Sequence, residues 1–118
     1  MKWSDDLAAR CSQLLSINRT LFDAGHLEAA YHALEAALYC AFDCGDLLTI
    51  HQVRAVAAAE HRRLSEQARA TRANPTTSLA ESRRLASLGG LYAIAVRQAS
   101  LKALNLDPSG ADTSEFGA

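Results

Sequence analysis

Two short stretches of nearly the same sequence decide how this chain folds. The stretch Phe22-Asp23-Ala24-Gly25-His26-Leu27 recurs 20 residues later as Phe42-Asp43-Cys44-Gly45-Asp46-Leu47. Glycine readily adopts the left-handed backbone conformation that closes the C-terminal end of a helix. We therefore predict that both glycines end a helix at the same kind of turn, so that three consecutive helices run up, down and up.

The segments around these turns have the apolar periodicity of amphipathic helices. Apolar residues recur at three- and four-residue spacing, which predicts helices at about residues 5–24, 27–43 and 47–72. Ser4 and Asp46 are suitable N-caps for the first and third of these helices. The second has apolar residues on two sides, so we expect two neighbours to cover it. The predicted apolar positions of the first are Leu7, Cys11, Leu14, Ile17 and Leu21.

A fourth helix is predicted at about residues 79–105. The segment Asn74-Pro75 ends the third helix, because proline disfavours helical backbone at the residue before it. Ser78 and Glu81 then form a capping-box pattern, in which each side chain bonds the backbone of the other residue. The pair Gly89-Gly90 lies inside this helix at a cost of about 2 kcal/mol of helix propensity relative to alanine. We expect a kink or a very close helix crossing there.

Composition indicates an all-α fold with a single core. Alanine (24) and leucine (17) dominate the 118 residues, whereas valine and isoleucine together number 6. Helix formers are therefore abundant and strand formers scarce, and a chain of this length holds one hydrophobic core. We predict an antiparallel bundle of about four helices at residues 1–106, followed by a disordered acidic tail at residues 107–118.

The cysteines and the N-terminal sequence favour a cytoplasmic location. Cys11, Cys40 and Cys44 are an odd number, which suits a reducing compartment better than a disulfide framework. The first residues carry charges where a secretory signal would be apolar, and no later stretch has the uncharged length of a membrane span. We therefore expect a cytoplasmic chain that does not act at a membrane.

Charge is distributed unevenly along the chain. The net charge of −1 combines −4 over residues 1–46, +6 over residues 47–106 and −3 over residues 107–118. Six arginines lie at the end of the third helix and the start of the fourth, where an antiparallel hairpin would bring them together. Such a cluster attracts phosphates or an acidic partner, although a merely solvated, arginine-rich end is the alternative. The six candidate binding residues are Arg62, Arg63, Arg69, Arg72, Arg83 and Arg84.

The first two helices share a pattern with a known family. Large apolar residues, a turn glycine and small packing residues stand at Leu14, Ile17, Leu21, Gly25, Leu27, Ala30, Leu34 and Ala37. In this respect residues 11–44 resemble a single tetratricopeptide repeat, the two-helix unit of protein-binding solenoids. The chain departs from the family at Asn18, where glycine is preferred, and at Phe42, near the position of a closing proline. The resemblance implies binding of a partner protein; convergence of a tightly packed helical hairpin is the alternative.

No pattern in the sequence predicts catalysis, a metal site or a cofactor. Glu28, His32 and Glu35 share a helix face, but carboxylate di-iron bundles use a Glu with a His three residues later, repeated on a second helix. Structural zinc needs four ligands, and Cys40 and Cys44 have no second pair. Nucleophile-elbow and phosphate-loop patterns are also missing from the sequence. We therefore expect a protein that is not an enzyme and uses no cofactor.

The sequence thus predicts a non-enzymatic protein-interaction or regulatory module. We expect a homodimer formed through the third and fourth helices, because the small residues Ala86, Gly90 and Ala93 permit close helix approach. Nucleic-acid or anion binding through the arginine-rich end is the alternative function. That end lacks the interleaved aromatic residues of a single-strand binder.

Overall fold

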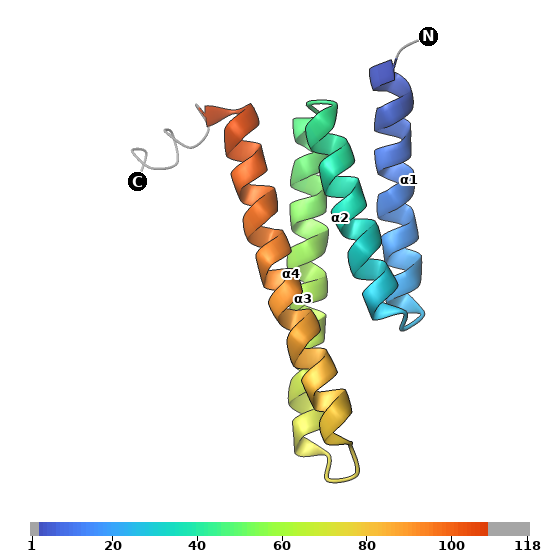
Figure 1. The fold of residues 1–118 in the computed structure, drawn as a ribbon, viewed down its shortest axis with the longest axis vertical. Helices are drawn as coiled ribbons and strands as arrows, with labels where there is room; N and C mark the ends of the chain where they lie inside the picture. The colour runs from blue at the N-terminus through green and yellow to red at the C-terminus, as the bar shows by residue number, and fades with distance from the viewer. Residues whose placement is uncertain (1–2, 109–118) are drawn as a thin grey trace.

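The computed structural model describes the backbone of residues 3–108 and the side chains of residues 6–108. This part of the chain folds into four helices and contains no strand, which confirms the predicted all-α class. The helices pack as two hairpins, α1 with α2 and α3 with α4 (Figure 1). Their bounds are α1 (Trp3–Asp23), α2 (Leu27–Asp43), α3 (Leu47–Ala73) and α4 (Leu79–Leu106).

The helix ends agree with the predicted ones to within two residues. α1 begins at Trp3, slightly before its expected start, and the side chain of its predicted cap, Ser4, lies outside the described residues. The predicted acidic tail lies outside them from residue 109 onward. In the described part of the chain, no helix combines the length and the hydropathy that a membrane crossing needs.

Both predicted glycine turns are confirmed. Gly25 has φ of +88° and Gly45 has φ of +68°. In each turn the amide after the glycine donates to the carbonyl five residues before it, with an N···O distance of 2.9 Å in both cases. This is the longer hydrogen bond of a Schellman motif. The repeat in sequence is therefore a repeat in structure that reverses the chain twice.

We expect the change Gly45→Val to lower the free energy of unfolding by about 1–2 kcal/mol, because a β-branched side chain is strained in left-handed backbone. A Cβ at this position would meet nothing within 4 Å, so strain rather than a clash would cause the loss. Urea denaturation measures it. Ala70→Val is the matched control, since Ala70 is also exposed but lies within a helix, in α3. Equal stabilities for the two variants would show that the turn does not depend on glycine.

The starts of α3 and α4 are capped as predicted, with one difference. Asp46 Oδ1 accepts a hydrogen bond from the Thr49 amide and Ser78 Oγ accepts one from the Glu81 amide, both at 3.1 Å. The Glu81 carboxylate does not return a bond to the Ser78 backbone. It pairs instead with Arg84 at 3.0 Å, because a guanidinium is a stronger donor than a neutral amide.

α4 runs without a break through Gly89 and Gly90. A Cβ added at either glycine would meet nothing within 4 Å. The expectation of a close helix crossing at this glycine pair is therefore wrong for the single chain, because no other helix lies within 4 Å of the positions that their Cβ atoms would take. Gly90 is exposed, whereas Gly89 is half-buried.

The core lies where α2 meets the other three helices. α2 contacts α1, α3 and α4, so its predicted two-sided burial is confirmed. The fourth helix contributes Tyr92, whose ring is fully buried and packs edge-on against Tyr31 and Phe22. Among the fully buried apolar side chains are Cys11, Ala30, Leu34, Ala37, Ile50 and Leu64.

α1 buries Cys11 and packs Leu14 and Leu21 against the core as predicted, but one predicted position differs. Ile17, expected among the buried apolar residues, is 48% exposed, whereas the neighbouring Asn18 is 0% exposed. Successive residues are about 100° apart on a helix, so burying one of the pair turns the other outward. The polar residue is buried because it has partners on other helices, as described next.

Candidate functional site: a groove between α1 and α3

A groove of about 720 Å³ runs between α1 and α3. These two helices contact each other far less than the two helices of either hairpin do, which leaves the groove open between them. Its apolar lining consists of Leu15, Ala55, Val56 and Ala59. Its polar lining consists of Ser12, Ser16, Arg19 and Asp23 from α1, with Gln52, Glu60 and Arg63 from α3.

A buried polar network beside the groove links all four helices. Asn18 Nδ2 on α1 donates to the Ala30 carbonyl of α2 at 2.7 Å and to Glu60 Oε1 of α3 at 3.0 Å. The Tyr92 hydroxyl of α4 donates to the same Glu60 oxygen at 2.6 Å. Asn18 and Tyr92 are fully buried, and Glu60 is only 5% exposed. The network therefore fixes the two hairpins relative to each other.

Two acceptor atoms of this network have no hydrogen-bond partner among the described residues. Asn18 Oδ1 is buried without one. Glu60 Oε2 also makes no hydrogen bond, while its residue lines the groove. Both Asn18 amide hydrogens are already used by Ala30 and Glu60. Of the two acceptor atoms, only Glu60 Oε2 belongs to a residue of the groove lining, so it is the acceptor of the network that faces the groove.

Burial controls the ionisation of the network. Desolvation raises the pKa of the Glu60 carboxyl, and the hydrogen bonds from Tyr92 and Asn18 and the charge of Arg63 only partly oppose it. Desolvation and the adjacent Glu60 together raise the pKa of Tyr92, so its hydroxyl remains a donor. A carboxylate held in this way is costly to leave without donors.

The raised pKa of Glu60 makes stability depend on pH with a definite sign. The folded state holds the Glu60 proton more tightly than the unfolded state. The favourable contribution of Glu60 to stability is therefore complete below the ordinary carboxyl pKa, and it is lost as pH rises through the raised pKa of the folded state. We expect the stability of wild type relative to Glu60→Gln to fall as pH rises from about 4. Urea unfolding of both proteins across this range measures the difference. A difference that grows with pH would contradict the assignment.

Arg63 closes one end of the groove. Its Nη1 lies 3.0 Å from Asp23 Oδ1 of α1, and its guanidinium stacks 4.7 Å from the centre of the Phe22 ring. These contacts join α3 to the end of α1 and neutralise the Asp23 charge. Arg19, on the α1 side of the groove, makes no ion pair or hydrogen bond with a described residue. Arg19 and Glu60 are thus the two groove charges without an ion-pair partner.

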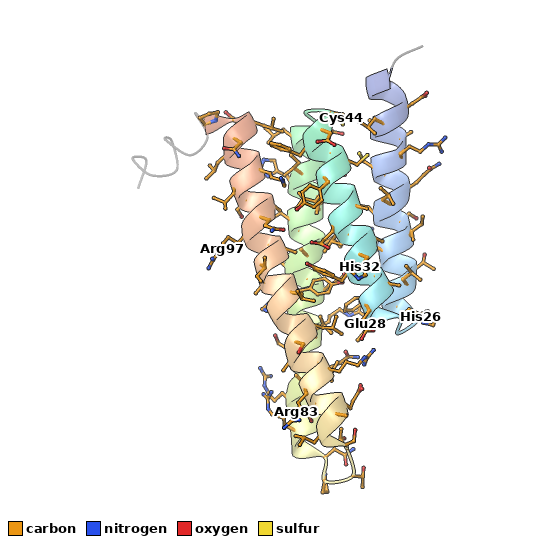
Figure 2. The ribbon with its side chains drawn as sticks, viewed as in Figure 1. His26, Glu28, His32, Cys44, Arg83 and Arg97 are labelled. Carbon is orange, nitrogen blue, oxygen red and sulfur yellow. The ribbon has the colours of Figure 1, made fainter. Side chains whose placement is uncertain are left out.

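The arginine-rich end is only partly assembled as the sequence predicts. The α3–α4 hairpin does bring the end of α3 beside the start of α4 (Figure 1). However, Arg63 binds Asp23, and Arg84 binds Glu28 of α2 at 2.8 Å. Figure 2 shows Glu28 at the α2 side of the hairpin and Arg83 at the opposite side. The remaining four, Arg62, Arg69, Arg72 and Arg83, are exposed and make no ion pair with a described residue.

The cysteine thiols and the Glu28 carboxylate are held by local contacts. Cys11, Cys40 and Cys44 are free thiols, and burial together with the two neighbouring thiols raises the pKa of Cys11. A raised pKa keeps a thiol protonated and unreactive. The hydrogen bond from Arg84 lowers the pKa of Glu28. Within residues 3–108, no three His, Cys, Asp or Glu side chains are arranged to hold a metal ion.

An exposed face of α4 carries small and large apolar residues, with the exposed Arg97 among them. The small residues proposed from sequence as a close-approach surface, Ala86, Gly90 and Ala93, are all exposed on it. The large apolar residues beside them, which the sequence pattern did not place on this face, are between 40% and 53% exposed. These residues are Leu91, Ile94, Leu101 and Leu104.

The two central residues of the network were not predicted from the sequence, although the pattern around each of them contains an indication of its role. Glu60 interrupts an apolar series on α3 that includes Val53, Ala57 and Leu64, at the spacing of one buried face. Asn18 stands where the tetratricopeptide pattern prefers glycine. A polar residue at a predicted core position indicates a buried hydrogen-bond partner elsewhere in the fold.

Comparisons with known proteins return no relative for this chain. No protein-family model, no curated protein and no solved structure matches it. The groove, the buried network and the α4 face are therefore the features on which a function can be based.

Proposed function

We propose that this chain is a non-enzymatic protein-interaction module and that a segment of its partner binds in the groove between α1 and α3. The observation that supports this proposal best is the groove itself. Its volume, about 720 Å³, lies within the range typical of ligand sites. Its lining combines apolar and polar side chains, as protein interfaces do.

We also propose that the α1–α2 hairpin is tetratricopeptide-like. Ala30 and Ala37, at the small packing positions of the pattern, are fully buried, and Gly25 closes the turn with positive φ. Asn18 replaces the expected glycine with a side chain that bonds to α2 and α3. Helical repeats stack into concave surfaces that bind partners, which agrees with a binding groove beside this hairpin.

The proposal is tested by selecting short random peptides displayed on phage against the purified chain. We expect peptides with micromolar dissociation constants that compete with one another for one site. Failure to recover any competing set of peptides would overturn the proposed function.

The nucleic-acid alternative is tested by titrating fluorescent duplex and single-stranded oligonucleotides into the same protein. Binding at physiological salt that is lost when Arg62, Arg63, Arg83 and Arg84 are changed to alanine would favour the nucleic-acid alternative instead.

We further propose that a second copy of the chain covers the exposed face of α4. In a two-fold interface the same patch of each copy meets that of the other, so the small residues around Gly90 would allow the two helices to approach closely. The large apolar residues on the same face would then be buried. The free thiols support the cytoplasm, a reducing compartment, as the location of this assembly.

We expect light scattering to give the mass of a dimer at micromolar concentration, because the α4 face leaves several large apolar side chains exposed in the single chain. Ile94→Asp should convert the dimer to a monomer, since it buries a charge in the interface. His51→Asp, at an exposed position on α3, is the control and should remain dimeric. A monomeric wild type at high micromolar concentration would contradict the proposal.

A further inference from the structure

We infer that the partner segment places a cationic side chain, lysine or arginine, in the groove against the carboxylate of Glu60. The inference rests on the proposed function, because it specifies the chemistry of the segment that the groove binds. Its basis is the unused carboxylate oxygen of Glu60 and the pairing of the charges around the groove.

The first observation is the state of the Glu60 carboxylate. The residue is 5% exposed and lines the groove. Its Oε1 accepts from Tyr92 and from Asn18, whereas Oε2 accepts no hydrogen bond from a described residue. A buried carboxylate is stable only when donors satisfy its lone pairs. The two bonds at Oε1 hold the group in place, and Oε2 remains available to a donor that enters the groove.

The second observation is the orphaned oxygen of Asn18. Oδ1 of this fully buried side chain has no partner, and its Nδ2 is bonded to the same Glu60 oxygen that Tyr92 contacts. The network therefore contains two adjacent residues with an unused acceptor and none with an unused donor. A guanidinium supplies five donors and an ammonium three, with no acceptor. Asn18 does not line the groove, so either group would reach Glu60 Oε2 alone, whereas a partner carboxylate would be repelled there.

The third observation is the distribution of the groove charges. Four charged side chains line the groove, and two of them, Asp23 and Arg63, neutralise each other at 3.0 Å. Arg63 is held there and also stacks on Phe22, so it is not the donor for Oε2. Glu60 therefore makes no ion pair with a described residue, and its carboxylate can pair with a charge on the partner. Arg19, which has no ion pair, would repel the cation from its own side of the groove and so helps to select Glu60 as its site.

The test uses pools of capped octapeptides that are random except for one fixed central residue: arginine, lysine, leucine or glutamate. Their binding to the full chain is compared by competition with a fluorescent peptide obtained in the selection described above. We expect the arginine and lysine pools to compete about tenfold better than the leucine pool, since a hydrogen bond to a charged group contributes on that order. The glutamate pool should compete least.

Two variants test whether Glu60 causes the preference for the arginine and lysine pools. Glu60→Gln removes the charge and keeps the side-chain shape and an acceptor oxygen, so it should abolish the cation preference while the leucine pool still competes. Glu66→Gln removes an exposed carboxylate from the same helix and should leave the preference unchanged. Should Glu60→Gln fail to fold, the ranking of the four pools on wild type still decides the matter. Equal competition by all pools, or a preference that survives Glu60→Gln, overturns the inference but leaves groove binding intact. A chain that binds no peptide overturns the proposed function itself.

Discussion

Replacing Asn18 by leucine should lower the free energy of unfolding by about 3–5 kcal/mol, which is a large part of the stability of a small domain. Leucine has the same branching and the same number of side-chain heavy atoms as asparagine, so it would fill the site. It cannot donate, so the Ala30 carbonyl loses its 2.7 Å bond and the Glu60 carboxylate keeps a single donor, Tyr92, in a buried position. Breaking one member of a buried charged network leaves the others unsatisfied.

Urea denaturation of wild type and Asn18→Leu measures this loss. Asn105→Leu is the control, because Asn105 is exposed near the end of α4 and makes no side-chain hydrogen bond with a described residue. Its stability should change by less than about 0.5 kcal/mol. If Asn18→Leu were as stable as wild type, the network would not be what holds the two hairpins together.

Filling the groove should weaken partner binding about a hundredfold, a loss of about 2.7 kcal/mol. Ala55 lies on α3, lines the groove and is exposed, so Ala55→Trp places a large ring in the binding volume without entering the core. Fluorescence anisotropy with a selected peptide measures the dissociation constant. The expected effect is steric, because the indole occupies the space that the peptide needs.

The matched control for the groove is Ala36→Trp. Ala36 is an exposed alanine on α2 and is not part of the groove lining, so the same substitution there should change the dissociation constant less than about threefold. Thermal unfolding of both variants shows that they fold. Loss of binding in Ala36→Trp together with normal binding in Ala55→Trp would place the partner on another surface.

The positions of the helices and turns along this chain follow from local sequence. Gly25 and Gly45 adopt left-handed φ in closely matching turns because their surroundings repeat, and this sets the direction of three helices. Asp46 and Ser78 cap the helices that follow them, as their positions predict. Each of these features depends on residues only a few positions apart, which is why periodicity and turn chemistry suffice to predict them.

The groove and its network depend on residues that are distant in sequence. Asn18 and Glu60 are 42 positions apart, and Tyr92 is 32 positions beyond Glu60. Local patterns predict that α1 and α3 exist, but not that they separate enough to leave a groove or how each is rotated. The exposure of Ile17 shows the difficulty, because a rotation of one position exchanges an apolar side chain for a polar one.

The location of the bound segment tests the central claim most directly. Backbone amide shifts of ¹⁵N-labelled chain are followed while a selected peptide is added. We predict that the perturbed amides concentrate on the groove-facing parts of α1 and α3, around Ser16, Ala55 and Glu60. Perturbations confined to the exposed face of α4, or to the arginines near the α3–α4 turn, would contradict binding in the groove.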